Sequence, residues 1–522
     1  MVPFKEMGCA AVVSFFSTAA HEISTSCVDG VPVCSIHFSE PECFQFVAEP
    51  ENNHLDFLET GTIQVDPEAK TLIDNPAIIA HKEEADGVEV ELFAIEDEIS
   101  ETETTDGTSS TSENNEETVS HKQAEVQTST TEEPNTSGPQ SIRILVGQTL
   151  STKRDVVFEP NNTKMVSHPN MGVIGTMGTG KTQFARSLIA QFSKEAIHNV
   201  GGKPVGILVF DYKGDYKDDE FLSAVNGTCY KFNYPFNPLK LVVNDQVESM
   251  NLPAITADRI ADSFAKAYGL GLKQQSNIKQ VIIETYADAG ITREPATWNN
   301  PVPTMEQVIE KYFDTYDAND KAFALFDKLR DYTIFTTDNN NCVSLFEWLD
   351  SVRVIDLTLY PDDTKKVIVS LILDLFYAEM RQLGGSRQEN GFRELRAMIM
   401  VDEAHQFLKK DFNSFRSIIS EGRMFGVGMI LSTQNISDFK TSKEDYSQFV
   451  LSWIIHHVNS ISKSEIASIF GASDSNGDKY MDFINKAKLF ESVCKIGSRV
   501  EGIRDEPFFE LIQNDERFSK ES

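Results

Sequence analysis

The 522-residue chain is poor in cysteine, and the arrangement of the few it has excludes two classes of protein. Its seven cysteines include no C-x-x-C pair, and an odd number in a long chain is untypical of a disulfide framework. Four of them lie in the first 43 residues, close to His21, His37 and His54, with an irregular spacing that argues against a zinc site. The cysteines therefore indicate reduced thiols, and we expect a cytoplasmic protein.

Long apolar runs are also missing. No stretch reaches the roughly 20 residues that a helix needs to cross a bilayer, so no membrane span is predicted. Residues 9–20 faintly imitate a signal peptide, but the stretch contains Ser14, Ser17 and Thr18 and only Lys5 precedes it closely. A buried helix or strand is the better interpretation of that segment.

Clusters of basic residues are absent as well, and most of the net charge of −33 comes from the N-terminal 140 residues. Residues 83–140 hold seventeen Asp or Glu and one Lys, whereas the chain from residue 141 onward is only mildly acidic. The whole-chain charge therefore says little about whether a local surface binds a polyanion. The lysines of the C-terminal part are scattered along the sequence and do not form a cluster that would indicate a DNA-binding groove; they include Lys409, Lys410, Lys440, Lys443 and Lys479.

Composition divides the chain into three parts. Residues 1–81 mix short apolar stretches with turn residues and predict a small β-rich N-terminal region. Residues 82–140 are rich in Glu, Thr, Ser and Asn, and such a segment buries too little apolar surface to offset its ordering entropy. We therefore expect 82–140 to be an acidic disordered linker, followed by a separate domain over 141–522.

From Ile142 onward, β-rich runs alternate with helical patterns, which predicts an α/β fold with a mainly parallel sheet. Two short strands are expected ahead of the glycine-rich segment, at Ile142–Val146 and Asp155–Phe158, separated by Gly147 and Gln148. The expected core strands are Pro204–Phe210, Val352–Leu357, Ala397–Val401, Val427–Ser432 and Phe449–His456, and the expected helices include Met305–Tyr316 and Thr364–Leu383.

A phosphate-binding loop is the strongest motif in the chain. It matches G-x-x-x-x-G-K-[ST] in full, after an apolar strand at Met171–Ile174 and before a helical pattern at Gln183–Phe192. Lys181 is expected to reach the β- and γ-phosphates of ATP, and Thr182 to offer its hydroxyl to Mg²⁺. The ATP-binding residues predicted are Gly175, Thr176, Met177, Gly178, Thr179, Gly180, Lys181 and Thr182.

Two carboxylates follow directly after the apolar run Ala397–Val401. A buried strand that ends in Asp402 places this acid beside the phosphate loop, where it holds the Mg²⁺ shell. Glu403 comes next and is placed to polarise the attacking water as general base. A core strand with an acidic surface end is the plainer alternative.

Two further catalytic residues are predicted around the next apolar strand. Gln434 follows the run Val427–Ser432 and is a candidate sensor of the γ-phosphate; the alternative is a turn residue at a strand end. Arg423 precedes the same run and is a candidate to stabilise transition-state charge on a neighbouring subunit's ATP. The alternative for Arg423 is a helix-end arginine that meets backbone carbonyls.

These blocks resemble the HerA/FtsK branch of P-loop ATPases, the hexameric DNA pumps. The likeness rests on the P-loop, on the block at 400–405 and above all on the segment at 421–434, with the segment at 211–215 as the branch's second-strand motif. Within the branch, the chain from Ile142 is similar to the C-terminal ATPase part of DptH, the restriction component of DNA phosphorothioation-dependent defence systems. The stretches 144–147, 168–170 and 232–239 support that subgroup.

The resemblance covers about 380 residues. It implies a RecA-like fold, ATP hydrolysis at subunit interfaces of a homo-oligomeric, hexameric ring, DNA as the track and a nuclease or defence-system partner. Two departures stand against it: DptH proteins are much longer, and the β-barrel expected ahead of a HerA motor is not evident. Six copies of a modest basic loop would be needed to line a pore.

Three other interpretations remain. Residues 402–405 also spell the DEAH box of superfamily-two helicases, but the 120 residues after Asp402 leave no room for the second RecA-like domain those enzymes need. His405 is then a helix-start residue. An ATP-driven assembly or signalling switch would carry the same P-loop. A conjugative-type coupling ATPase would need a membrane partner, since no span is predicted.

Overall fold

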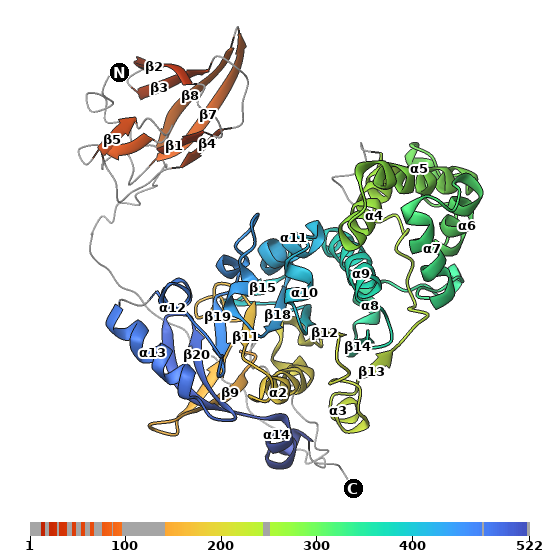
Figure 1. Cartoon of the computed structure of the whole chain (residues 1–522). Helices are drawn as coiled ribbons and strands as arrows, with labels where there is room; N and C mark the ends of the chain where they lie inside the picture. Colours follow the sequence, from red (N-terminus) through yellow and green to blue (C-terminus); the bar gives the residue numbers. More distant parts are fainter. Residues whose placement is uncertain are drawn as a thin grey trace, which may run out of the picture. The chain divides into compact units, whose positions relative to one another are not determined.

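The computed structural model describes residues 141–243, 251–471 and 474–518, together with the strands between Val12 and Glu96 (Figure 1). The chain divides into two compact units, Met1–Ser129 and Thr130–Ser522. The predicted linker beyond Glu96, and the side chains of the N-terminal cysteines and histidines, lie outside the described residues.

The described part of the N-terminal unit consists of β-strands. Its largest sheet has the order β2-β3-β8-β7, and two-stranded sheets pair β1 with β4 and β5 with β6. The β7–β8 hairpin runs across residue 81, the predicted end of the β-rich region, and the division into domains stays a prediction. The strands are β1 (Val12–Phe15), β2 (Ala20–Val28), β3 (Val31–Phe38), β4 (Phe44–Val47), β5 (His54–Phe57), β6 (Ile63–Asp66), β7 (Pro76–Ala85) and β8 (Gly87–Glu96).

One eleven-stranded sheet organises the C-terminal unit, and the predicted mainly parallel α/β fold is confirmed. Its strands are β9 (Ile144–Thr149), β10 (Asp155–Phe158), β11 (Met171–Ile174), β12 (Gly206–Asp211), β13 (Thr228–Tyr230), β14 (Val352–Asp356), β17 (Ala397–Val401), β18 (Val427–Thr433), β19 (Ser452–Ile455), β20 (Glu491–Ile496) and β21 (Arg499–Asp505). Their order is β10-β9-β21-β20-β19-β11-β18-β17-β12-β14-β13. In this order, neighbouring strands pair antiparallel from β10 as far as β19. From β19 to β13 they pair in parallel.

The central strands are buried on both faces, as their unbroken apolar runs predict. Successive side chains of a strand point to opposite faces, so each strand contributes to two cores. Ile207 and Val209 belong to one core, and Leu208 and Phe210 to the other. Helices must therefore cover both faces of the sheet.

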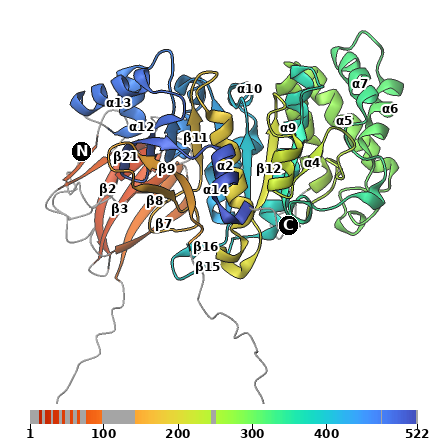
Figure 2. The same ribbon diagram turned by 90° about the horizontal axis from the view of Figure 1, so that it is seen from below.

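One face is covered by the P-loop helix α2 (Lys181–Lys194), by α3 (Asp219–Ala224) and by α14 (Phe508–Asn514) (Figure 2). Phe184 and Leu188 of α2 are fully buried against this face. The opposite face is covered by α9 (Asp362–Leu383), α10 (His405–Leu408), α11 (Asn413–Glu421), α12 (Lys463–Phe470) and α13 (Asp474–Lys486).

A helical insertion separates β13 from β14 and explains the long distance in sequence between Lys181 and Asp402. Its helices are α4 (Leu252–Tyr268), α5 (Leu272–Asp288), α6 (Met305–Thr315), α7 (Lys321–Tyr332) and α8 (Leu345–Trp348). They gather at one end of the sheet, beside α9 (Figure 1). A capping box at Thr304 and Gln307 begins α6 at Met305, the predicted first residue of that helix.

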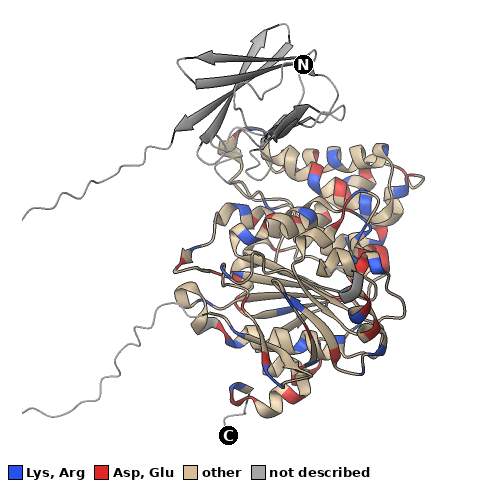
Figure 3. Cartoon of the chain, turned by 90° about the vertical axis from the view of Figure 1, so that its left-hand side faces the viewer, with Lys and Arg blue, Asp and Glu red and all other residues tan. Residues whose placement is uncertain are grey.

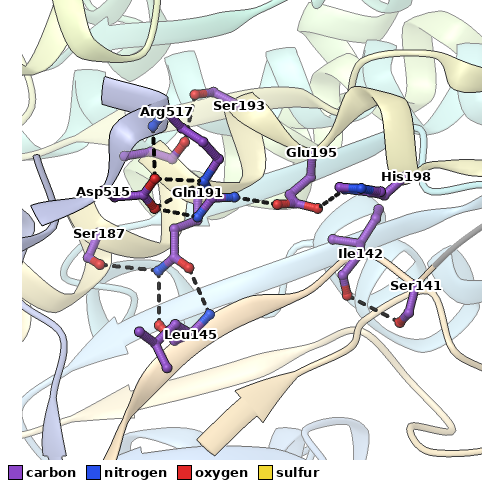
Figure 4. A network of polar contacts seen from close by, with 11 residues as sticks. Ser141, Ile142, Leu145, Ser187, Gln191, Ser193, Glu195, His198, Asp515 and Arg517 are labelled. Carbon is purple, nitrogen blue, oxygen red and sulfur yellow. Dashed lines mark hydrogen bonds and ion pairs between the residues drawn. The ribbon is translucent and has the colours of Figure 1, made fainter. Parts of the chain in front are cut away.

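Polar contacts hold the far end of α2 in place (Figure 4). The Gln191 side chain donates to the Leu145 carbonyl at 2.9 Å and accepts from the Leu145 amide at 2.7 Å, which ties α2 to β9. Arg517, near the C-terminus, donates to Glu195 just after α2. These contacts position the helix that begins at the P-loop.

Two predicted boundaries were wrong. Gly147 and Gln148 do not separate two strands but lie inside β9, because β21 pairs with them; a Cβ on Gly147 would lie 2.2 Å from the Arg504 carbonyl oxygen. The predicted strand Phe449–His456 shortens to β19, since a 3₁₀ turn at Tyr446–Phe449 precedes it. Among the described helices, none combines the length and apolar character that crossing a membrane requires.

Candidate nucleotide-binding and catalytic site

The P-loop connects β11 to α2, and its backbone needs glycine at two positions. Gly178 and Gly180 have φ of 80° and 107°, a region that side chains with a Cβ rarely adopt. The Lys181 ammonium donates to the carbonyls of Gly175 and Thr176, the latter at 3.0 Å, so the lysine folds back over the loop. The loop therefore has the form that cradles phosphate groups.

The segment after β19 supports the P-loop from one side. The Thr176 amide donates to the His457 carbonyl at 2.9 Å, and a Cβ on Gly175 would lie 2.7 Å from the Cβ of His456. His456 is buried, with Nε2 2.6 Å from an Asp505 carboxylate oxygen and Nδ1 3.1 Å from the Ile174 carbonyl oxygen. The polar pair His456–Asp505 thus fixes the start of the loop to β21.

The order of the strands brings the other predicted site residues to the P-loop. β18 lies between β11 and β17, with Ile174 beside Thr433 and Leu431 beside Val401. The carboxyl ends of these parallel strands therefore meet at one edge of the sheet. Gln434, Asp402 and Glu403 follow these ends directly, so the structure assembles them beside Lys181 and Thr182.

Asp402 is buried at the end of β17. Burial raises the pKa of its carboxyl to about 6, and the neighbouring Glu403 adds to the increase, while Lys213 and a hydrogen bond with Ser432 oppose it. A cation next to Asp402 would favour its charged form.

Glu403 has an unusual backbone conformation for a residue with a side chain. Its φ is 49°, and such strain concentrates at functional sites because the surrounding structure must hold it. One carboxylate oxygen contacts the Lys213 ammonium, and the other lies 3.2 Å from Nδ1 of His405. His405 chiefly, together with Lys213, lowers the pKa of Glu403 to about 2, so this carboxylate stays ionised.

Gln434 is the next neighbour of the same carboxylate. Its side-chain amide donates to Glu403 at 3.5 Å, the outer limit of a hydrogen bond. The two residues come from adjacent strands, 31 positions apart in sequence. The structure thus places Gln434 between the P-loop and the pair of carboxylates, and its role as sensor stays a prediction.

The loop after β12 supplies two site residues to which the sequence interpretation assigned no role. Asp211–Asp215 was noticed as a strand-end motif, and the structure shows why it matters: Lys213 contacts Glu403, and Asp215 lies 3.4 Å from the Thr182 hydroxyl. The signal was a third polar segment directly after a buried strand. His405 was interpreted as a helix-start residue; it does begin α10, and it also lies beside Glu403.

Asp211 shapes this loop from within. Its fully buried carboxylate accepts four backbone N–H groups, three on Oδ1 (Lys213, Gly214 and Asp215, at 3.2, 2.6 and 3.1 Å) and one on Oδ2 (Tyr216, at 3.1 Å). Burial nevertheless raises the pKa of Asp211. A single carboxylate thereby sets the direction in which Lys213 and Asp215 point.

Replacing Asp211 with asparagine is expected to destabilise the protein and to lower ATP turnover. The amide nitrogen would face an N–H donor, and leaving such a group unsatisfied costs about 1–3 kcal/mol. The measurement is the free energy of unfolding in urea, with ATPase activity on the same samples. Asp314→Asn, on an exposed position of α6, is the matched control; equal stability of the two variants would contradict the role of Asp211.

The charged groups of the site are two lysines, Lys181 and Lys213, and three carboxylates, those of Asp402, Glu403 and Asp215. Burial and Lys213 lower the pKa of Lys181, while Glu403, Asp402 and Asp215 oppose that decrease. Among the described residues, no group of three or more His, Cys, Asp or Glu side chains could hold a metal by itself. Mg²⁺ typically takes one or two carboxylates and completes its shell with water and substrate phosphate. Thr182 and Asp402 are the residues that would hold it.

Arg423 lies at the other edge of the sheet. It belongs to the 3₁₀ turn η7 (Gly422–Phe425) before β18, and a seven-residue strand spans about 20 Å. Its guanidinium is close enough to Arg393 and His168 to lower the pKa of both, second to the effect of burial; the pKa of His168 falls to about 4. Arg423 therefore cannot reach the P-loop of its own chain.

The turn that carries Arg423 is held rigidly. Gly426 has a φ of 74°, and a Cβ there would lie 2.2 Å from the Glu394 carbonyl oxygen, so only glycine fits. Ser386 and Arg393 donate to the Met424 carbonyl at 2.9 and 3.3 Å. These contacts hold the backbone of the turn at the end of β18 that is opposite the nucleotide site.

Comparison with known proteins found matches to parts of the chain. Residues 144–376 match the sequence model of the family described as "Helicase HerA, central domain". The match includes the P-loop and ends before the segments that carry Asp402, Arg423 and Gln434. The chain is 24% identical over 304 residues to the DNA import protein CedB of Sulfolobus acidocaldarius, covering 56% of this chain and 44% of CedB. It therefore spans less than half of that relative.

The fold is similar to that of a solved structure, VirB4 of Thermoanaerobacter pseudethanolicus. The TM-score is 0.54 at 16% sequence identity, with 72% of this chain and 98% of that chain covered. The plasmid coupling protein TrwB in complex with the ATP analogue ADPNP matches more loosely, with a TM-score of 0.41 at 13% identity over 65% of this chain and 87% of that chain.

Proposed function

We propose that this protein is a Mg²⁺-dependent ATPase that works as a ring and moves DNA. The observation that carries the proposal is the meeting of strand ends, which brings the P-loop, Asp402, Glu403 and Gln434 together at one edge of the sheet. The match of residues 144–376 to the HerA central domain supports the same class.

Each residue has a defined task in the proposed hydrolysis. The P-loop amides and Lys181 bind the phosphates, and Thr182 and Asp402 hold Mg²⁺, which neutralises charge on the β- and γ-phosphates when bound. Glu403 accepts the proton of the attacking water as general base. Gln434, in contact with Glu403, responds to the γ-phosphate. Lys213 and His405 hold the Glu403 carboxylate ionised, as a base must be.

The position of Arg423 supports a ring. Because this side chain lies at the edge opposite to its own P-loop, it can act only on the nucleotide of another subunit. A head-to-tail contact that repeats and closes generates a cyclic homo-oligomer. We propose a hexamer, in which Arg423 of each subunit completes the site of its neighbour.

DNA is the proposed track. Lys409 lies in the segment that follows β17 and Glu403, and Lys440 and Lys443 lie in the segment that follows β18 and Gln434. All three lysines are exposed. Lys409 and Lys443 also pair with Asp438 and Asp411, at 3.3 and 3.7 Å. Basic and acidic residues are interspersed along the described ribbon (Figure 3). A phosphate track would thus require repetition of these lysines around a ring.

ATP turnover is expected to rise severalfold when DNA is added, and the rise is expected to weaken with salt because phosphate contacts release counterions. The experiment measures ATPase activity with and without duplex or single-stranded DNA, on material whose mass in solution is also determined. The double variant Lys440→Ala/Lys443→Ala should lose stimulation while keeping DNA-free turnover. Absence of DNA binding at low salt, with an ATP analogue present, would refute the DNA role.

The biological setting is the finer part of the proposal. The resemblance to DptH favours a restriction or antiviral defence system with a separate nuclease partner. The similarity to CedB, a DNA import protein, and to VirB4 favours a second candidate, a coupling ATPase that passes DNA to a membrane apparatus. Co-purification from cells separates them: a nuclease partner supports the first, and a membrane-protein partner the second.

A further inference from the structure

An aromatic pair stands next to the P-loop and has no part in the chemistry described above. Phe490 lies in the turn between α13 and β20, and a Cβ on Gly180 would lie 2.6 Å from its ring. Phe509, in the first turn of α14, has its ring centroid 5.7 Å from that of Phe490. The two residues are more than 300 positions from Gly180 in sequence, so only the fold brings them there.

Phe490 is held against the loop in a costly conformation. Its φ is 62°, which is rare for a bulky side chain and signals strain that the surroundings maintain. Its amide donates to the Thr179 carbonyl at 3.3 Å, and its own carbonyl accepts from the Asp505 amide at 2.8 Å. The backbone is thus fastened on both sides in a way that keeps the ring beside Gly180.

The second ring is attached to the P-loop helix. The Phe509 amide donates to the side chain of Gln183 at 3.3 Å, and Gln183 follows Thr182 in the first turn of α2. Phe509 is 38% exposed. Leu489, which precedes Phe490 in sequence, is 57% exposed, and Met177 of the P-loop is 83% exposed. An apolar surface next to a phosphate cradle therefore remains open to solvent.

The polarity of the site determines which end of a nucleotide meets this surface. Asp402, Glu403 and Gln434 follow β17 and β18, so the γ-phosphate and Mg²⁺ belong on that side of β11. The α-phosphate and the nucleoside must then leave the loop over the start of α2, where the sheet continues into β19, β20 and β21. That is the side on which Phe490 and Phe509 lie.

Resting on the ATPase function proposed above, we propose that Phe490 and Phe509 form the platform on which the nucleotide base stacks. The ligand class is a planar heteroaromatic base joined to a triphosphate. Stacking of a base on an aromatic ring tolerates every base, because each has a π-face. GTP is therefore expected to bind nearly as well as ATP.

The test compares a ligand with a base to one without. Phe490→Gly removes the ring and suits a φ of 62°, and Phe490→Tyr retains the ring. We expect Phe490→Gly to weaken binding of a non-hydrolysable ATP analogue by about 5- to 150-fold in the presence of Mg²⁺, the range typical of lost base stacking. Binding of inorganic tripolyphosphate should stay unchanged, and Phe490→Tyr should bind both ligands like the natural chain. Isothermal titration calorimetry on the full-length chain measures each affinity.

Controls separate the outcomes. Phe232 is an exposed phenylalanine that follows β13, the last strand of the sheet on the side away from Phe490. The variant Phe232→Leu should bind both ligands normally. Equal weakening of analogue and tripolyphosphate by Phe490→Gly, or no weakening of either, overturns the platform. If Phe490→Gly does not fold, as judged by circular dichroism, Phe509→Leu takes its place with the same two outcomes. Unchanged binding of both ligands by Lys181→Ala would instead refute the P-loop function itself.

Discussion

Replacing Glu403 with glutamine is expected to leave ATP binding intact and to lower turnover about 10²- to 10⁴-fold, the usual contribution of a general base. The amide has the same shape, so the strained backbone at φ 49° and the packing against Gln434 persist. It cannot accept the proton of water, and it cannot form an ion pair with Lys213. Single-turnover hydrolysis measures the rate, and titration with an ATP analogue measures the affinity.

Glu347→Gln is the matched control for that variant. Glu347 is an exposed glutamate of the short helix α8, remote from the strand ends, and its substitution should change neither quantity. Unchanged turnover in Glu403→Gln would remove Glu403 from the role of base. Lost binding would show that the carboxylate instead maintains the pocket through Lys213.

Replacing Arg423 with alanine is expected to abolish turnover, by about 10³- to 10⁵-fold, while each isolated subunit still binds ATP. The guanidinium supplies positive charge to the transition state of a neighbour's phosphate, and the distance of about 20 Å across β18 rules out action within one chain. Arg143→Ala, which removes an exposed arginine paired with Glu159, is the control and should retain turnover.

Mixing the two inactive variants tests whether Arg423 acts between subunits. An interface made by a Glu403 from the Arg423→Ala subunit and an Arg423 from the Glu403→Gln subunit contains both intact groups. Random assembly gives this combination at about one quarter of interfaces of a cyclic ring. Turnover should therefore return on mixing, measured after dissociation and reassembly. If equal mixtures that assemble normally show no recovery, Arg423 does not complete a neighbour's site.

Local sequence patterns were sufficient for the phosphate loop and the carboxylate pair. Glycines at 178 and 180 are needed because the backbone there adopts positive φ, and Lys181 begins a helix directly after them. Asp402 and Glu403 were identified because an unbroken apolar strand ends in two acids. Such features depend on neighbouring residues in the sequence. The eight residues of the P-loop and the seven residues Ala397–Glu403 are therefore enough to predict them.

Other parts of the site depend on strand order, which no local pattern contains. The sequence alone did not indicate that β18 would lie between β11 and β17, or that the loop after β12 would bring Lys213 to Glu403 and Asp215 to Thr182. The prediction that Gly147 ends a strand was also wrong. The contact that keeps Gly147 inside β9 comes from Arg504, which is far away in the sequence.

The sequence by itself predicted the class of chemistry: a loop for phosphates, a carboxylate pair for a metal and for water, and an arginine shortly before a strand. The tertiary structure decided where these groups lie. It joined strand ends as distant in sequence as Ile174 and Thr433, set Arg423 at the opposite end of the strands, and placed Phe490 against Gly180. The physical reason is that residue type and local backbone follow from short-range interactions, whereas proximity follows from how buried strands pair across the whole core.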